Sequence, residues 1–395
     1  MRTFTRTRKG RRIPYVDLAA QHAPLKAKLL EAIADVIDEG QFILGRQVAD
    51  FEEEFAVLCG VRHAVALNSG TDALVLALEA VGVGPGDEVI TVPNSFVAST
   101  ACIARLGARP VLVDVGADYN IDPAKIEPAI TPRTKAILPV HLTGRPCEMD
   151  RILAIAQAHG LAVVEDCAQA VLAEYKGRRV GSFGAAGCFS LHPLKTLNAC
   201  GDGGALTTND TQVYERLRLA RNHGLRSRDD CAFWSGNSRL DTMQAAILLV
   251  KLRHLEEWTE RRRANARIYR ELLTDIPEVR VPRDVDHIKP VYHTLVVQAE
   301  GRNELRGYLS ARGIETAIHY PVPIHLSAAA TDLGFPKGSF PVAEQQAGRI
   351  LSLPIYPELT ESQINRVCDS IRAFYGYRPL ASCDEVQLES QLLLP

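Results

Sequence analysis

The chain has 395 residues, 46% of them hydrophobic and 23% charged, and a formal net charge of −2 at pH 7. This length predicts one large and one smaller domain, and the near-balanced charge favours neither nucleic acid nor a membrane surface as a partner. No run of about 18 apolar residues is present, so we expect no membrane span. The nine cysteines are scattered, odd in number and without a CxxC pair. That pattern argues against a disulfide framework or a zinc site and favours the cytoplasm.

The N-terminus is strongly basic, because positions 2, 6, 8, 9, 11 and 12 are all Arg or Lys. We expect residues 1–12 to form a solvated flexible tail, with nucleic-acid binding or targeting as the alternative. No apolar segment follows these charges, so a secretory signal is not predicted.

Short apolar runs alternate with helical patterns between about residues 60 and 210. Buried strands are predicted at 63–67, 88–91, 111–114, 136–139, 162–165 and 205–208. Helices are predicted between them, at 71–81, 96–106 and 149–159. This alternation indicates an α/β fold with a mostly parallel sheet that is covered on both faces.

The pattern changes after the long helix that we expect at 240–260. Helices at 264–273, 303–312 and 361–374 and strands at 292–298 and 316–320 predict a small α+β domain. We therefore place a large domain at 13–260, a small domain at 261–376 and a C-terminal extension at 377–395. Within this extension, residues 387–394 fit either a short helix or an arm on a partner subunit.

Two residues of opposite charge suggest a cofactor-binding site. Asp166 closes the apolar run 161–165, and Lys195 lies between Ser190 and the glycine-rich stretch 201–204. A pyridoxal phosphate site needs an acid that keeps the pyridine nitrogen protonated, a lysine that forms a Schiff base with the aldehyde, and hydroxyl and N–H groups for the phosphate. Asp166 also fits a helix N-cap, and Lys195 a surface lysine, although apolar neighbours surround Lys195. Burial there would lower the pKa of its amine.

Two further segments fit the same cofactor. Ser69-Gly70-Thr71 follows a predicted strand and opens a predicted helix, where free N–H groups and the helix dipole favour a phosphate. An ordinary capped turn is the alternative. Phe96 could stack on a cofactor ring or belong to the core, and Gln169 is placed to face the ring or its 3′ oxygen.

With these residues in place, the chain resembles the DegT/DnrJ/EryC1/StrS family of sugar aminotransferases, which have the fold type I (aspartate aminotransferase) architecture. The resemblance covers about residues 13–375. Its motifs are at 68–74, 94–100, 140–144, 165–170, 189–195 with 201–204, 222–224, 237–246, 319–321, 325, 340–344 and 352–357.

The resemblance implies a role for each site residue. Lys195 and Asp166 are the catalytic residues, and no metal is expected. The cofactor contacts are Gly70, Thr71, Phe96, Asp166, Gln169, Ser190, Lys195 and Asn237. Asn237 would reach the phosphate of the neighbouring subunit's cofactor, so a homodimer with a shared active site is expected. The substrate contacts are His192, His319, Tyr320 and His325.

Members of this family move an amino group from glutamate or glutamine to a keto group of a nucleotide-linked sugar or a cyclitol. Asn237-Ser238-Arg239-Leu240-Asp241 with His319-Tyr320-Pro321 looks most like enzymes that act on dTDP-3-keto-6-deoxyhexoses. The two substrates would use one site in turn, which predicts ping-pong kinetics. His192 stands where many relatives have Tyr or Phe, and Thr143 where Tyr is common.

Three other functions remain open at this point. One is a cyclitol aminotransferase acting on a substrate such as scyllo-inosose. A second is a pyridoxal phosphate-dependent sugar dehydrase, although relatives with that activity replace the lysine with histidine. The third is a non-catalytic regulatory protein of the same fold, against which the intact Lys195, Asp166 and phosphate turn argue.

Overall fold

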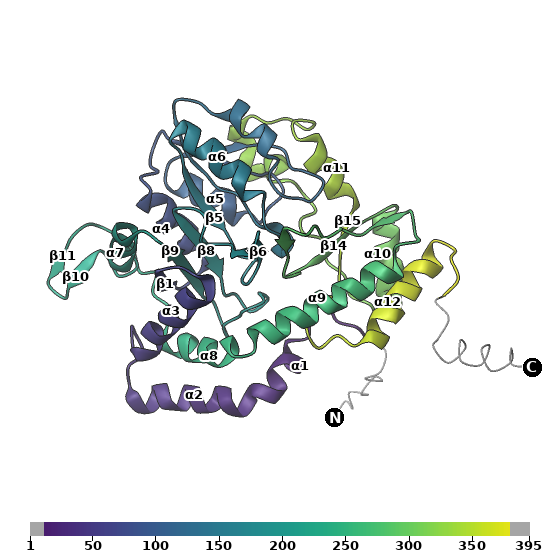
Figure 1. Cartoon of the computed structure of the whole chain (residues 1–395), viewed down its shortest axis with the longest axis horizontal. Helices are drawn as coiled ribbons and strands as arrows, with labels where there is room; N and C mark the ends of the chain where they lie inside the picture. The colour runs from purple at the N-terminus through teal and green to yellow at the C-terminus, as the bar shows by residue number, and fades with distance from the viewer. Residues whose placement is uncertain (1–11, 380–395) are drawn as a thin grey trace, which may run out of the picture.

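A computed structural model of the chain describes residues 12–379, and its centre is a seven-stranded sheet (Figure 1). All its neighbouring strands pair in parallel except β9, which runs antiparallel to both of its neighbours. The predicted mostly parallel sheet is therefore confirmed. In spatial order the strands are β1 (His63–Leu67), β9 (Gly204–Thr208), β8 (Ala186–Ser190), β5 (Ala162–Asp166), β4 (Thr134–Ile137), β2 (Glu88–Thr91) and β3 (Arg109–Leu112).

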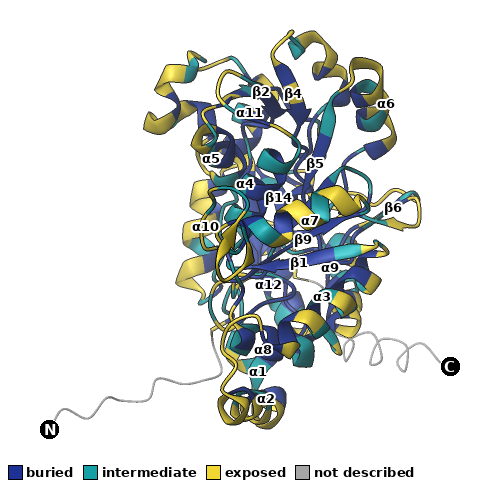
Figure 2. Cartoon of the chain, turned by 90° about the vertical axis from the view of Figure 1, so that its left-hand side faces the viewer, coloured by how far each residue is buried: buried dark blue, intermediate teal, exposed yellow. Residues whose placement is uncertain are grey.

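Helices cover both faces of this sheet because alternate strand residues point to opposite sides. Val65 and Val164 face α4 (Gly70–Ala80), α5 (Ala98–Arg105) and α7 (Thr211–Ala220). Ala66 and Val163 face the other side, where α3 (Arg46–Cys59), α8 (Thr242–Leu252) and α6 (Met149–His159) pack. Figure 2 shows the result, with the strands dark blue inside and the outer helix faces yellow.

The carboxyl ends of β1, β5 and β8 lie at one edge of the sheet. Because β9 is antiparallel, its first residue lies at this edge as well: Gly204 pairs with Ser190 on one side and with Leu67 on the other. The segments that follow Leu67, Asp166 and Ser190 therefore converge there. In open α/β sheets this is the edge at which ligands bind.

Two predicted strands of the large sheet begin two residues earlier than expected, and one strand of this sheet was not predicted. β3 and β4 start at Arg109 and Thr134, because both of these residues pair with Glu88 of β2. The unpredicted β8 contains Gly187, which lowers strand propensity. A side chain there would lie 2.3 Å from the Gly181 Cα atom.

The helix predicted at 240–260 is in fact two helices, α8 and α9 (Leu255–Leu272). The last turn of α8 tightens where the His254 N–H donates to the Lys251 carbonyl, and Glu256 and Glu257 follow in the first turn of α9. Acidic residues favour a helix start, so a new helix begins inside the apolar pattern. α9 also absorbs the helix predicted at 264–273. α9 continues without a break across residue 260, where the large domain was predicted to end. The domain limits stay a prediction.

The C-terminal part contains a three-stranded sheet of β12 (Val279–Arg280), β14 (Leu295–Ala299) and β15 (Ile350–Leu353). The second half of α9, α10 (Arg302–Ala311) and α12 (Glu361–Phe374) share one apolar core with it. Figure 1 shows α9 running from α8 to this region. The prediction of a strand at 316–320 is wrong. Only Ala317 pairs with β15, and the chain then turns away so that His319 and Tyr320 line a cavity.

The remaining elements were not predicted. They are α1 (Leu18–His22), α2 (Lys26–Glu39), α11 (Pro341–Arg349), a sheet of β6 (Glu174–Tyr175), β7 (Arg178–Arg179) and β13 (Ile288–Lys289), a hairpin of β10 (Leu225–Ser227) and β11 (Asp230–Cys231), and short 3₁₀ turns. No helix among residues 12–379 is long and apolar enough to cross a membrane. The predicted tail 1–12, apart from Arg12, and the segment 387–394 lie outside the described residues.

Candidate active site

A cavity of about 510 Å³ opens at the edge where β1, β5 and β8 end. Most of the predicted site residues line it, although they come from segments far apart in the sequence. These residues are Gly70, Thr71, Phe96, Asp166, Gln169, Ser190, His192, Lys195, His319 and Tyr320.

Lys195 and Asp166 belong to this cavity. Burial lowers the pKa of Lys195 to about 8, and the charge of Asp166 opposes that effect. Near neutral pH the uncharged fraction of this amine is therefore much larger than that of an ordinary lysine, as a nucleophile or base requires. Asp166 is 4% exposed and accepts hydrogen bonds from the Ser99 hydroxyl at 2.7 Å and the Ala168 N–H at 3.1 Å. Among the described residues, no cation is in ion-pair contact with this buried carboxylate.

The turn before α4 lines the cavity through Ser69, Gly70 and Thr71. Ser69 caps the helix by accepting from the Asp72 N–H at 3.1 Å. A Cβ atom on Gly70 would lie 2.7 Å from the Ser190 Cβ atom, so only glycine allows the turn and β8 to approach this closely. The N–H groups of Gly70 and Thr71 are first-turn donors with no acceptor inside the helix.

Three further residues lie around Tyr320. Phe96 is 54% exposed, and its ring centroid is 5.9 Å from that of Tyr320. Gln169 is buried, accepts from the Thr143 N–H at 2.7 Å and donates to the Tyr320 hydroxyl at 3.4 Å. Thr143 therefore takes part through its backbone N–H group.

The two predicted histidines of the cavity differ in environment. His192 is exposed, and its Nδ1 accepts from the Leu194 N–H at 3.2 Å. His319 is partly buried and contacts the Ser352 hydroxyl at 2.8 Å. Burial, followed by the charge of Lys195, lowers the pKa of His319 to about 4, so its ring is neutral at pH 7.

Two predicted residues do not line the cavity. Asn237 is exposed and accepts from the Arg239 Nε–H group at 2.9 Å. His325 is 4% exposed, contacts Glu344 at 3.0 Å and packs edge-on against Phe340. Because this acid and ring enclose His325, its predicted substrate contact has no support from the geometry within one chain.

Four residues of the cavity were missed. Tyr15, His293 and Thr294 each have a buried polar side-chain atom without a hydrogen-bond partner, and Arg262 on α9 is 4% exposed. Tyr15 is brought in by the segment before α1, and His293 and Thr294 precede β14. No local motif marks them, because packing of the two parts of the chain brings them together.

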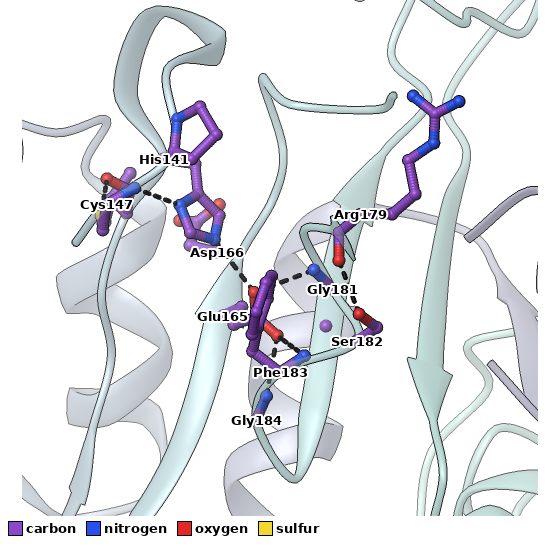
Figure 3. A network of polar contacts seen from close by, with 12 residues as sticks. His141, Cys147, Glu165, Asp166, Arg179, Gly181, Ser182, Phe183 and Gly184 are labelled. Carbon is purple, nitrogen blue, oxygen red and sulfur yellow. Dashed lines mark hydrogen bonds and ion pairs between the residues drawn. The ribbon is translucent and has the colours of Figure 1, made fainter. Parts of the chain in front are cut away.

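A buried network lies behind Asp166 (Figure 3). Glu165 accepts from the N–H groups of Gly181, Phe183 and Gly184 at 2.8–2.9 Å and from His141 Nε2 at 3.1 Å. His141 Nδ1 accepts from the Cys147 N–H, which places the ring proton on Nε2. The main-chain N–H of His141 also donates to the Asp166 carbonyl at 3.0 Å.

This network includes one group with metal-ligand chemistry, because the ligand atoms of His141, Glu165 and Cys167 lie within 4.8 Å of one another. The Glu165 oxygens already accept four hydrogen bonds, and both His141 nitrogens have partners. We therefore interpret this group as structural.

Comparison with known proteins places this geometry in a family. The model of the DegT/DnrJ/EryC1/StrS aminotransferase family matches residues 24–372. The chain belongs to this aminotransferase family.

Relatives and solved structures are similar over nearly the whole aminotransferase chain. The dTDP-3-amino-3,4,6-trideoxy-alpha-D-glucose transaminase of Streptomyces venezuelae is 47% identical over 362 residues, which are 91% of this chain and 96% of that protein. The structure of S. venezuelae DesV in complex with a ketimine intermediate is 46% identical, with a TM-score of 0.91, and covers 93% of this chain and 99% of that one. The PLP-form of the putative sugar aminotransferase Spr1654 from Streptococcus pneumoniae is 26% identical, with a TM-score of 0.83, and covers 88% and 95%.

The chain is thus a pyridoxal phosphate-dependent aminotransferase with the fold type I architecture, as the resemblance implies. The cavity of this aminotransferase fits the cofactor. The close approach of Gly70 to Ser190 leaves the first-turn N–H groups of α4 facing an anion site. The buried carboxylate of Asp166, which has no cation in contact, matches a protonated ring nitrogen.

Proposed function

We propose that this enzyme moves the amino group of glutamate to the keto carbon of a nucleotide-linked deoxysugar, specifically a dTDP-3-keto-6-deoxyhexose. The observation that carries the proposal is the position of Lys195 in the same cavity as Asp166 and the α4 turn. The transaminase name of the 47% identical relative supports the choice of a dTDP-linked sugar.

The predicted site residues of the cavity have the following roles in this proposal. Gly70, Thr71 and Ser190 hold the phosphate of the cofactor, Phe96 stacks on its ring and Gln169 contacts its ring oxygen. Asp166 holds the proton on the ring nitrogen, and Ser99 and the Ala168 N–H fix the direction of that carboxylate. Bound pyridoxal phosphate supplies an electron sink for the electron pair of the broken Cα–H bond.

Lys195 moves the proton in both halves of the reaction. It takes the proton from the glutamate Cα. The amino group would stay with the cofactor, water supplies the keto oxygen as the bond between the glutamate Cα and its nitrogen breaks, and 2-oxoglutarate leaves. The sugar gives up its keto oxygen as water in the second half. In the second half it delivers a proton to the carbon of the sugar that becomes the amine-bearing carbon. The neutral ring of His319 and the Tyr320 hydroxyl lie beside Lys195 in the cavity and contact the sugar or its diphosphate.

A panel of amino acceptors tests this proposal. We expect glutamate to support turnover of dTDP-3-keto-6-deoxyhexoses, with parallel double-reciprocal lines because both substrates use one site in turn. UDP-linked keto-sugars and scyllo-inosose are the comparison substrates. Turnover of scyllo-inosose alone would replace the proposal with a cyclitol aminotransferase. Intersecting lines would contradict the ping-pong order.

We also propose that the enzyme is a homodimer with shared sites in the cytoplasm. Asn237 is exposed and lies outside its own cavity, which leaves it free to contribute to another one. Apolar side chains are exposed as well, including Phe42, Ile43 and Trp234, which is 93% exposed. Exposed apolar groups of this size are typical of a subunit interface.

Mixing two inactive variants tests the shared site. If Asn237 serves the partner's cavity, a dimer of one Lys195→Ala chain and one Asn237→Ala chain has one intact site and one doubly altered site. Random re-association of equal amounts should then restore about a quarter of the wild-type sites. Activity that stays at the level of the separate variants would show that Asn237 does not act across an interface.

A further inference from the structure

A buried cation without a counter-ion lies in the active-site cavity. Arg262 lies on α9 and is 4% exposed. Its Nη1 donates to the carbonyls of Ile355 at 2.7 Å and Tyr292 at 3.3 Å, which leaves Nε and Nη2 without an acceptor within residues 12–379. Arg262 lines the 510 Å³ cavity and, together with Lys195, a narrow hollow beside it.

The charge of Arg262 is not neutralised by the protein. In the described part of the chain, no carboxylate lies within ion-pair distance of its guanidinium, and Glu358 attracts it only from further away. Burial lowers the pKa of Arg262 to about 10, so the side chain is still charged at neutral pH. A buried charge without a partner is costly, and a ligand anion would remove that cost.

Neutral hydrogen-bonding groups without partners surround the same end of the cavity. They are the Tyr15 hydroxyl, His293 Nδ1 and the Thr294 hydroxyl. The pKa of His293 is held well below its usual range, first by burial and then by the charges of Lys195 and Arg262. One cation with several neutral polar groups is the environment that a carboxylate needs.

Two anions of the substrates could use this end of the cavity, and their chemistry separates them. The α-carboxylate of an amino acid is attached to the carbon that bears the reacting amine, so its binding residue must lie near Lys195. Arg262 meets this requirement, because both residues line the cavity and the hollow. A nucleotide diphosphate is separated from the reacting carbon by the sugar ring, and it needs room toward the open mouth, where Phe96 and Leu194 are half exposed.

We propose that Arg262, with Tyr15, His293 and Thr294, binds the α-carboxylate of the amino donor. This inference rests on the proposed function, since it assumes an α-amino acid donor. It makes Arg262 a residue that selects the donor rather than the sugar.

The binding of α-methylglutamate to the holoenzyme tests the proposal. This analogue keeps the α-carboxylate but has no α-hydrogen, so calorimetry reports binding without turnover. We expect Arg262→Met to weaken its affinity at least about thirtyfold, because a buried charge partner is lost. Affinity for dTDP should stay within about threefold. Arg263→Met is the matched control, since Arg263 also donates to backbone carbonyls, those of Pro290 and Leu172, but does not line the cavity.

Several results would overturn the assignment. They are equal losses for α-methylglutamate and dTDP, a loss for dTDP alone, an equal loss in Arg263→Met, or no binding of α-methylglutamate to the wild type. If Arg262→Met does not fold, Arg262→Lys keeps the charge but not the planar fork. A wild-type comparison of glutamate with 4-aminobutyrate, which lacks the α-carboxylate, gives the same answer. Glutamate should react at least about thirtyfold better, and equal reactivity would contradict the proposal.

Failure of the proposed function would look different. If the enzyme binds α-methylglutamate through Arg262 but aminates none of the keto-sugars, the proposed acceptor is wrong and the proposed donor site is supported. If the enzyme aminates the sugars but Arg262→Met does not weaken the binding of α-methylglutamate, the proposed function is supported and the role of Arg262 is contradicted.

Discussion

Lys195→Ala is expected to lower the rate of transamination at least about 10³-fold, because one side chain both anchors the cofactor and moves the proton. Steady-state assays with glutamate and the best keto-sugar measure the loss. Absorbance spectra before and after addition of glutamate show which half of the reaction stops. An activity within tenfold of the wild type would remove Lys195 from the mechanism.

Small amines provide the control for folding. Methylamine can enter the space left by the lysine side chain and should restore part of the activity if the variant is folded. The pH dependence should then change. The wild-type rate should rise as pH increases through about 8, where Lys195 loses its proton, whereas the rescued rate should follow the higher pKa of the added amine. Absence of rescue together with a normal circular dichroism spectrum would contradict the role of Lys195 in proton transfer.

Glu165→Gln is expected to destabilise the enzyme by about 3–5 kcal/mol, the cost of breaking a buried charged network by changing one partner. The Glu165 side chain is 0% exposed, and its two oxygens accept four hydrogen bonds. The amide NH₂ group of Gln would point a donor at two of those donors. Urea unfolding of the holoenzymes at equal protein concentration gives the difference in unfolding free energy.

The surface of the protein offers a matched control for this substitution. Glu127 contacts His159 Nε2 at 3.0 Å, as Glu165 contacts His141, but the Glu127 side chain is 66% exposed. Glu127→Gln should therefore cost between about 0 and 1 kcal/mol. Similar losses at both positions would mean that the buried network does not contribute more than a surface pair. The main-chain N–H of His141 donates to the Asp166 carbonyl. A shift of His141 in the Glu165 variant should therefore move Asp166 and lower the activity under conditions in which the variant remains folded.

The sequence predicts the large sheet and the adjacent half of the site for a physical reason. Strands such as β1 and β5 contain apolar runs because both of their faces are buried, and functional residues such as Asp166 lie at their carboxyl ends. A local pattern is sufficient wherever a strand ends at the cavity. β8 is missed because it contains Gly187, which lowers strand propensity. Only glycine fits at this position, since the chain at Gly181 passes too close for a side chain.

The other half of the site could not be predicted in this way. Arg262 lies in the basic run 261–263, which resembles a solvated helix face, yet it is buried because the segments of Tyr292 and Ile355 cover it. Tyr15 depends on how the N-terminal segment folds back. The family resemblance implied that His325 contacts the substrate. Instead the chain directs it toward Glu344.

The antiparallel direction of β9 has a consequence for the chain entropy of the lysine loop. Residues 191–203 leave the sheet at Ser190 and return at Gly204, and these two residues pair with each other. The loop is further closed where the Leu191 N–H donates to Gly203 and the Ala199 N–H donates to Leu191, at 2.8 and 2.7 Å. A short loop with joined ends has lost most of its conformational freedom on folding. Lys195 is therefore ordered before any substrate arrives, and little further entropy is lost when the reaction begins.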